Sequence, residues 1–305
     1  MYSIIIPIFN EEQTLPVLRQ RLVEVLLPLD EPFEVILVDD GSRDQSFALM
    51  QEIHIKDPHF KILRLARNFG HQVAISAGID MAEGDAVLLM DGDLQDPPEL
   101  VPQMVALWKE GYHVVYTVKR SRQENPLKNV AFKLFYRVIR ALSSIEIPME
   151  AGNFSLLDRR VVDVLRSMPE RNRYISGMRA WAGFRQTAIY YDRAARYAGK
   201  PRMHLGRLIR LALDGIFSFS DVPLRLAVYL GFVVACLSFL GGAYVVYAKL
   251  FTDRAILGWA STILSILFVG GMILLTLGVI GEYISRIYEE VKRRPLYVIR
   301  DKIGF

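Results

Sequence analysis

The sequence predicts an α/β fold: a doubly wound, Rossmann-like domain with a mostly parallel sheet, followed by amphipathic interface helices and two transmembrane helices. Strand-like and helix-like runs alternate through about residue 120, which favours a parallel sheet. The strand-like runs are rich in Val, Ile and Leu without polar alternation, as is typical of strands buried on both faces. Two long uncharged runs occupy the last quarter of the chain.

Five strands are expected in the first part of the chain, at residues 3–7, 33–39, 60–65, 86–90 and 114–117. Helices are expected between them, at residues 14–29, 46–57, 73–82 and 98–110. Polar clusters follow the first, second and fourth strands, namely Asn10-Glu11, Asp39-Asp40-Gly41-Ser42 and Asp91-Gly92-Asp93. Ligands of such sheets bind beyond the carboxyl ends of the strands, so we expect the three clusters to meet at one edge.

The region after residue 120 predicts amphipathic helices. In residues 126–142, Lys133, Arg137 and Arg140 share one face and apolar residues the other. This pattern fits an ordinary surface helix or a helix lying near anionic lipid. Residues 204–219 repeat it directly before the uncharged runs, and we expect them at a membrane interface. The tail contains a strand-like Leu-Tyr-Val-Ile run at 296–299, which could add to a neighbouring sheet.

The uncharged runs at residues 226–248 and 255–281 predict a membrane hairpin. The first run alone, at about 1.5 Å per residue, is long enough for a hydrocarbon core of about 30 Å. Basic residues concentrate on the two outer flanks, which places the α/β domain in the cytoplasm by the positive-inside rule. We expect a catalytic domain at 1–203, a juxtamembrane helix at 204–224, the hairpin at 225–286 and a cytoplasmic tail at 287–305. The N-terminus shows no signal-peptide pattern.

Several common sites are excluded by pattern. The sequence contains no G-x-G-x-x-G, no P-loop and no G-x-S-x-G motif. Its one cysteine, Cys236, excludes an intrachain disulfide framework and a cysteine-based zinc site. The net charge of +4 says little by itself, and we expect no nucleic-acid partner. Phosphate binding therefore needs another device.

Asp91 and Asp93 supply such a device. On an extended segment, residues i and i+2 project to one side, so both carboxylates could face one divalent ion of the Mg²⁺ or Mn²⁺ kind, with Gly92 allowing close approach. Asp96 is expected to cap the helix that follows. The Asp39-Asp40-Gly41-Ser42 run fits a turn at Asp40-Gly41, with Ser42 or Asp44 capping the next helix, and Asp39 could accept hydrogen bonds from a base or ribose.

Together the motifs resemble a known family. They read Ile-Ile-Ile-Pro-Ile-Phe-Asn-Glu (4–11), Val-Asp-Asp-Gly-Ser (38–42), Arg-Asn-Phe-Gly-His (67–71) and Asp-Gly-Asp-Leu-Gln-Asp-Pro-Pro-Glu (91–99). Four ordered motifs of this kind resemble the GT-A glycosyltransferases of family 2. The nearest resemblance is to the polyprenyl-phosphate glycosyltransferases, including dolichol-phosphate mannose synthase and bacterial undecaprenyl-phosphate glucosyltransferases. The resemblance continues at 152–159, 179–184 and 196–202 and through the two apolar helices.

The resemblance implies a set of site residues. A donor pocket would contain Pro7, Phe9, Asn10, Glu11, Asp39, Asp40, Ser42, Arg67, Asp91 and Gln95. The metal ligands would be Asp91, Asp93 and Gln95, and the catalytic candidates Asp93 and Asp158. Phosphate and acceptor contacts would come from Arg120, Arg122 and Arg202. Phe9 replaces a frequent Tyr, and Pro201 and Met203 depart from the Gly-x-Ser-Lys-Tyr loop, so hydroxyl contacts at these positions are lost.

The resemblance also implies a reaction: inverting transfer of one sugar from UDP-glucose to undecaprenyl phosphate, at the cytoplasmic face of a bacterial inner membrane, for envelope or O-antigen modification. Mg²⁺ or Mn²⁺ would stabilise the leaving diphosphate. The acceptor phosphate is mostly dianionic at neutral pH, so Asp158 is either a base or a positioning group. GDP-mannose and a UDP-4-amino-arabinose derivative remain alternative donors, and a membrane-tethered receiver-like signalling domain is the alternative of another class. Gly241-Gly242 and Gly270-Gly271 would permit a homo-oligomer, with a tetramer as one form.

Overall fold

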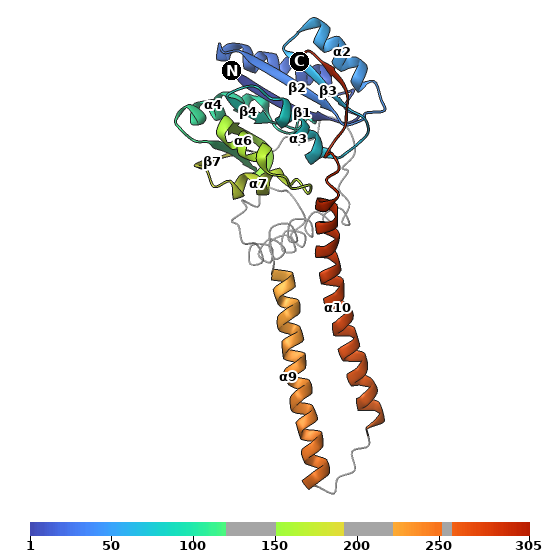
Figure 1. Ribbon diagram of the computed structural model, residues 1–305. Coiled ribbons are helices and arrows are strands. Elements are labelled where there is room, and N and C mark those ends of the chain that lie inside the picture. Colours follow the sequence, from blue (N-terminus) through green and yellow to red (C-terminus); the bar gives the residue numbers. More distant parts are fainter. Residues whose placement is uncertain (120–150, 192–221, 252–257) are drawn as a thin grey trace. The chain divides into compact units, whose positions relative to one another are not determined.

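The computed structural model describes residues 1–119, 151–191, 222–251 and 258–305. The chain divides into two compact units (Figure 1). One unit holds the sheet and includes the last residues, 294–305, while the other holds the two long helices.

The first unit is built on one sheet, which among the described residues has the strand order β7-β5-β6-β4-β1-β2-β3-β8. The strands are β1 (Tyr2–Ile8), β2 (Phe33–Asp39), β3 (Phe60–Leu65), β4 (Ala86–Leu89), β5 (Val114–Lys119), β6 (Ala151–Asp158), β7 (Gln186–Tyr191) and β8 (Ile299–Ile303). The central strands β4, β1, β2 and β3 are parallel, whereas β6 and β8 run antiparallel to their neighbours. The predicted α/β fold with a mostly parallel sheet is confirmed.

Helices cover both faces of this sheet (Figure 1). They are α1 (Leu15–Leu26), α2 (Ser46–Lys56), α3 (His71–Met81), α4 (Val101–Lys109), α6 (Arg159–Ser167) and α7 (Ile175–Trp181). Apolar residues of α1, α2 and α4 join alternate residues of β1 and β2 in one continuous core. On the other face α3 packs so closely that a Cβ at Gly78 would lie 2.3 Å from the Ile5 side chain, so only glycine fits at this contact.

The sequence located these elements well. All five predicted strands and all four predicted helices before residue 120 are confirmed, with ends that differ by at most three residues. Differences of three residues occur twice: α4 begins at Val101 after the 3₁₀ turn Pro98–Leu100, and α1 ends at Leu26 before the 3₁₀ turn Leu27–Leu29. Pro28 explains this end because it has no N–H to continue the helical hydrogen bonds. The helices expected at 126–142 and 204–219 lie outside the described residues.

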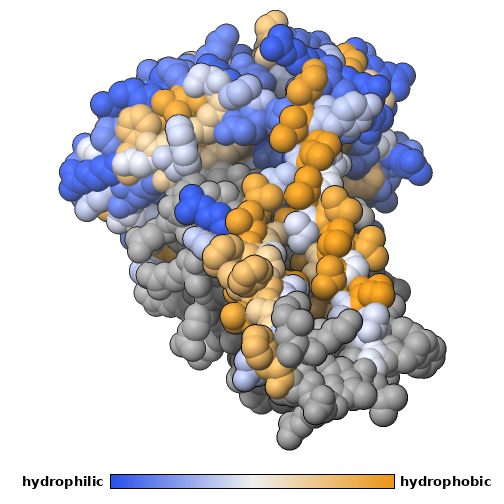
Figure 2. Space-filling view, turned by 60° about the horizontal axis from the view of Figure 1, so that its bottom comes forward, coloured by the Kyte–Doolittle hydropathy of each residue, from blue (hydrophilic) through white to orange (hydrophobic). Residues whose placement is uncertain are grey.

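The second unit is a pair of long helices, α9 (Val222–Phe251) and α10 (Trp259–Val291), that lie side by side (Figure 1). Their apolar side chains are exposed, as Figure 2 shows. Leu224–Tyr244 and Phe268–Val291 are long and apolar enough to cross a membrane. The helix α10 continues ten residues beyond the predicted end at 281, and its extension carries an Arg286–Glu282 ion pair at 2.9 Å.

The C-terminal tail returns to the sheet of the first unit. Its strand β8 pairs with β3, and the N–H of Ala66 donates to the carbonyl of Val298 at 2.8 Å. The sequence suggested a strand at 296–299 in a neighbouring sheet. The observed strand begins at Ile299 and closes the edge of the chain's own sheet.

Candidate active site

Three polar loops meet at the carboxyl edge of the parallel strands. The strands β4, β1 and β2 are adjacent and parallel, so the residues that follow Ile8, Asp39 and Leu89 emerge at the same edge. Within β1, Pro7 is buried, and Phe9 is half-buried directly after the strand. The expectation that the clusters after strands one, two and four come together is confirmed.

The loops after β1 and β2 are tied together by hydrogen bonds. The N–H of Asn10 donates to the Ser42 hydroxyl at 3.1 Å, and the N–H of Arg43 donates to the Asn10 side-chain oxygen at 2.8 Å. Asn10 adopts a left-handed backbone with φ of +53°, which asparagine tolerates better than most residues. The N–H of Glu11 donates to Ser46 at 2.9 Å. Asn10, Glu11 and Ser42 therefore form one fixed wall.

Asp39 and Asp40 are both buried at the end of β2, but they have different partners. Asp39 accepts a hydrogen bond from the N–H of Ser42 at 2.8 Å through Oδ1, and its Oδ2 lies 3.3 Å from Arg64 Nε. Asp40 accepts from the N–H groups of Phe69 and Gly70, at 2.7 and 3.0 Å. Burial raises the pKa of Asp40 above its ordinary value, against the effect of these two donors. Asp40 thus holds the loop at 66–70 in place.

That loop carries Arg67 and approaches the β2 loop closely. The Arg67 guanidinium stacks over the Phe69 ring at 4.0 Å and is exposed. Gly41 has φ of +73°, and a Cβ there would lie 2.7 Å from the Arg67 backbone, so glycine is required on both counts. The geometry leaves the Arg67 side chain at the surface of the edge.

Asp91, Asp93 and Gln95 follow β4 in a turn. The strand ends at Leu89, so the two acids do not lie on an extended segment as the sequence suggested. Asp93 Oδ1 accepts from the N–H of Gln95 at 3.1 Å, and Leu94 has a positive φ of 59°. A Cβ at Gly92 would lie 2.8 Å from Ile8 Cδ1, so Gly92 allows this turn to pack on β1.

The donor set of this turn suits a hard divalent cation. Its carboxylates are the oxygen ligands that Mg²⁺ and Mn²⁺ prefer. In the part of the chain that the structure describes, no group of three His, Cys, Asp or Glu side chains forms a complete metal site. Besides Asp91 and Asp93, the side chain of Gln95, water or a substrate phosphate could supply further ligands.

His71 lies beside Asp91 at this edge, although its position was not among those expected from the sequence. Its Nε2 is 2.9 Å from Asp91 Oδ1, and its side chain is 44% exposed. Desolvation opposes a charge on His71, but the carboxylates of Asp91, Asp40 and Asp93 outweigh it and raise the pKa of His71. The signal was present, because His71 ends the Arg-Asn-Phe-Gly-His motif.

Asn153 and Gln72 form a second layer that sequence reasoning also missed. Gln72 donates to Asn153 Oδ1 at 3.3 Å and accepts from the N–H of Ile175 at 3.0 Å. Ser176 Oγ lies 3.4 Å from the same Asn153 oxygen. These bonds connect α3, β6 and α7 behind the edge.

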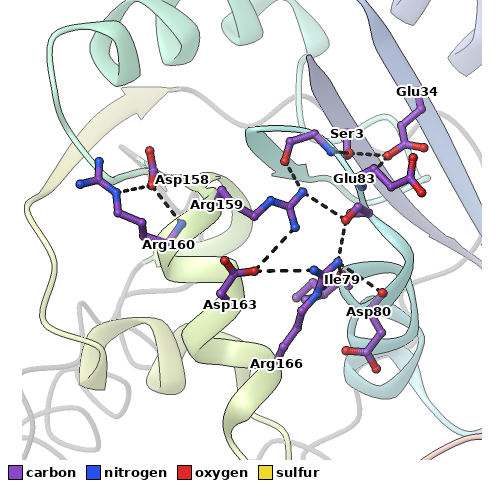
Figure 3. Close-up of polar contacts among 12 residues, drawn as sticks. Ser3, Glu34, Ile79, Asp80, Glu83, Asp158, Arg159, Arg160, Asp163 and Arg166 are labelled. Carbon is purple, nitrogen blue, oxygen red and sulfur yellow. Dashed lines mark hydrogen bonds and ion pairs between the residues drawn. The ribbon is translucent and has the colours of Figure 1, made fainter.

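Asp158 lies at the opposite edge of the sheet. Because β6 runs antiparallel to β4, Asp158 pairs with Ala86 at the start of β4, whereas Asp91 follows the end of that strand. Its carboxylate caps α6 through the N–H of Arg160 at 3.0 Å (Figure 3). It also accepts from Trp108 Nε1 at 2.9 Å. The expected place of Asp158 beside the acceptor therefore needs correction: the structure does not bring it together with Asp91 and Asp93.

The remaining expectations concern the Asp96 helix cap and the three arginines proposed to contact phosphate. The helix cap expected of Asp96 is wrong, since the 3₁₀ turn Pro98–Leu100 has no side-chain cap and Asp96 instead accepts from the Tyr191 hydroxyl at 2.6 Å. Arg120, Arg122 and Arg202 lie outside the described residues, as do Pro201 and Met203.

Comparison with known proteins gives two family matches. The family described as Glycosyl transferase family 2 matches residues 3–166, and the family described as GtrB C-terminal hairpin matches residues 222–287. The chain is 45% identical over 304 residues to an uncharacterized glycosyltransferase, YkcC, of Bacillus subtilis, covering 99% of this chain and 94% of that protein. It is 38% identical over 299 residues to the SfII prophage-derived bactoprenol glucosyl transferase of Shigella flexneri, covering 98% and 97%.

Solved structures show the same fold. The crystal structure of glucosyl-3-phosphoglycerate synthase from Mycobacterium tuberculosis, in complex with Mn²⁺, UDP and phosphoglyceric acid, matches with a TM-score of 0.51 and 18% identity. The match covers 72% of this chain and 78% of that protein. At this identity the likeness extends to the fold of the sheet domain.

Proposed function

The chain belongs to glycosyl transferase family 2, and we propose that it transfers one glucose unit from UDP-glucose to undecaprenyl phosphate, giving a lipid-linked sugar. The observation that carries this proposal is the match to a bactoprenol glucosyl transferase along 98% of the chain, hairpin included. A donor-binding domain alone would support many sugar transfers. The hairpin adds a lipid acceptor, because two apolar helices hold a catalytic domain at a membrane surface.

The donor site of this proposal lies at the carboxyl edge of β4, β1 and β2. Asp39 would accept hydrogen bonds from the base or ribose, and Asn10 with Ser42 would fix the wall of the pocket. Arg67, at the surface of the edge, would reach a phosphate, since a guanidinium suits planar phosphate oxygens. Asp40 would act by holding the loop that presents Arg67.

Asp91 and Asp93, with Gln95, are the residues that would hold Mg²⁺ or Mn²⁺ together with the donor diphosphate. When bound, such an ion supplies Lewis-acid stabilisation of the negative charge that develops on the leaving diphosphate. His71 would orient the Asp91 carboxylate through their 2.9 Å contact. The Mn²⁺ and UDP in the glucosyl-3-phosphoglycerate synthase structure accord with this choice of ion.

The acceptor is itself the nucleophile in this mechanism. A phosphate monoester is mostly dianionic at neutral pH and attacks without losing a proton to a base. In-line attack of its oxygen on the anomeric carbon breaks the bond to the diphosphate and inverts the configuration. Asp158, at the other edge of the sheet, has no role in this step. Arg120, Arg122 and Arg202 remain proposed phosphate contacts.

The connectivity of the chain supports a two-pass hairpin. Residues before α9 and residues 294–305 belong to the same unit, so both ends of the helix pair must leave and re-enter on one side of a membrane. Basic residues gather at these ends, including Arg225, Arg293 and Arg294, and by the positive-inside rule they support our proposal that the sheet domain faces the cytoplasm at the inner membrane.

The test is transfer by the purified full-length protein, in detergent with undecaprenyl phosphate, from a panel of UDP-glucose, GDP-mannose and a UDP-4-amino-arabinose derivative. We expect UDP-glucose to be used and a chelator to stop the reaction until Mg²⁺ or Mn²⁺ is restored. Asp93→Asn should lower kcat by at least about 10²-fold, because it removes a ligand charge while keeping the shape. Asp163→Asn, an equal charge change on α6, is the matched control.

A fully active Asp93→Asn variant would contradict the site. Use of another donor alone would contradict the sugar and leave the rest of the proposal in place.

A further inference from the structure

Three side chains form a row across the adjacent strands β2, β3 and β8. Asp39 pairs with Arg64 in the parallel β2–β3 register, and Arg64 pairs with Asp301 in the antiparallel β3–β8 register. Directly opposite residues of neighbouring strands point to the same face of a sheet, so the three lie in line. We call this set the Asp39–Arg64–Asp301 row.

The contacts in the row are asymmetric. Arg64 Nε lies 3.3 Å from Asp39 Oδ2, and Arg64 Nη1 lies 3.7 Å from Asp301 Oδ2. Asp39 is fully buried, Arg64 is 21% exposed and Asp301 is 44% exposed. The Arg64 guanidinium also stacks over the Phe47 ring of α2 at 3.9 Å. Arg64 is therefore held on three sides, by two carboxylates and one aromatic face.

Asp39 depends on this arrangement for its orientation and for polar partners inside the fold. A fully buried carboxylate is unfavourable unless a cation or hydrogen-bond donors compensate it. One oxygen of Asp39 has the Ser42 N–H, while Oδ2 has Arg64 nearby but no well-formed hydrogen bond among the described residues. Oδ2 thus retains acceptor capacity beside the proposed donor site, and the Arg64 guanidinium lies next to it.

We infer that Arg64 positions Asp39 for nucleotide recognition and that Asp301, on the strand after the membrane hairpin, orients Arg64. The inference rests on the proposed function only in taking Asp39 as a donor-nucleotide contact. Asp301 lies ten residues beyond the end of α10 at Val291. The strand β8 is therefore part of the donor site, and the segment that leaves the hairpin helps to form the nucleotide pocket.

The alternative is that the row only stabilises the sheet edge. If the row only stabilised the sheet, the variants would have a lower melting temperature. Apparent kcat would then fall with the fraction of folded protein, and the donor KM of the folded protein would not change. A positioning contact would change the donor affinity of protein that is fully folded. It would leave kcat nearly constant, because the lost interaction contributes equally to the ground state and the transition state.

The test uses full-length Arg64→Gln, Asp301→Asn and the double variant, with Arg21→Gln and Asp163→Asn as charge-matched controls on exposed ion pairs. Two quantities are measured: the UDP dissociation constant without acceptor, and the donor KM and kcat. We expect Arg64→Gln to weaken UDP and raise donor KM by about tenfold, and Asp301→Asn by about threefold, with kcat within about threefold. The double variant should be no worse than Arg64→Gln, because both changes act through one contact.

Unchanged UDP binding and KM in both variants, in an active wild type, would overturn the inference, as would a fall in kcat alone. If Arg64→Gln does not fold, Asp301→Asn decides, since this exposed side chain can change without loss of the core. A wild type that binds UDP but transfers no sugar to polyprenyl phosphate would contradict the proposed function and leave the inference standing.

Discussion

Replacing Arg179 with methionine should stabilise this protein. Arg179 lies on α7 and is 1% exposed, and none of its three guanidinium nitrogens has a hydrogen-bond partner in the residues that the structure describes. Its guanidinium lies over the Tyr116 ring, 5.1 Å from the ring centre. Burial lowers the pKa of Arg179 to about 10, so at neutral pH the side chain is charged and the penalty is fully present.

The magnitude follows from this pKa. Each pKa unit corresponds to about 1.4 kcal/mol, so the fall from the ordinary value represents roughly 3 kcal/mol of unfavourable free energy. The methionine loses a cation–π contact of about 1–2 kcal/mol and fills most of the arginine stem's volume. The net gain is about 1–2 kcal/mol, which raises the melting temperature by roughly 3–6 °C for a domain of this size.

The assay is thermal unfolding of full-length protein in detergent, followed by tryptophan fluorescence. The matched control is Arg173→Met, also a buried arginine, whose guanidinium donates to the carbonyls of Met168 at 2.6 Å and Leu165 at 2.9 Å and to Ser76. That change leaves buried carbonyls unpaired and should destabilise by about 2–4 kcal/mol. Equal destabilisation by both variants would refute the reasoning. A stabilised Arg179→Met variant with lost transfer would show that the unpaired charge serves a substrate anion.

Three other changes test the site and the fold. Asp158→Ala should lower the free energy of unfolding by about 1–2 kcal/mol, because it removes the α6 cap and the hydrogen bond from Trp108, and kcat per folded molecule should not change. A large fall in kcat at an unchanged melting temperature would instead support the catalytic role expected from the sequence. Asp40→Asn should cost about 1–3 kcal/mol and weaken donor binding, as read by urea unfolding and UDP titration, because an amide NH₂ would face a backbone N–H. Desolvation raises the pKa of Glu34, but hydrogen bonds from the backbone N–H of Glu83 and from the side chains of Lys61 and Ser3 outweigh it and hold this pKa below its ordinary value. The ionised Glu34 therefore stabilises the folded protein above the unfolded pKa of about 4.3, and this stabilisation is lost as pH falls through the folded pKa. Glu34→Gln should flatten that acid limb in unfolding measured from pH 7 to 3, and an unaltered limb would contradict this account.

The sequence predicted that the acidic clusters share one edge of the sheet, because the carboxyl ends of parallel strands lie together. Strand ends could be located from Val-Ile-Leu runs, and every parallel strand brings its carboxyl end to one edge, so Asp39, Asp91 and Asp93 converge as expected. The resemblance to family 2 glycosyltransferases is confirmed on the same motifs.

The same reasoning failed for Asp158 because strand direction is not local. β6 runs antiparallel to β4, and the residue that reaches the donor side of β6 is Asn153, five positions earlier. A sequence motif gives the order of residues along the chain. It does not show whether a strand runs parallel or antiparallel to its neighbours, and so it does not show which end of the strand lies at the site. His71 was missed for a related reason: its partner Asp91 is 20 residues away, and the pairing depends on how α3 begins beside β4.

The tail links the helix hairpin to the sheet through the chain. Residues 222–291 are in effect an insertion within the chain that forms a single sheet, since β8 follows the hairpin and pairs with β3 at the edge. A strand at this position shields the β3 edge and places Asp301 against Arg64. A soluble domain ending near residue 203 would lack that strand, so its β3 edge would be open and Arg64 would keep only Asp39 as an acidic partner among the described residues. The last strand of the sheet follows the hairpin in the chain. The sheet, and with it the proposed nucleotide pocket, is therefore complete only when the residues after the hairpin are in place.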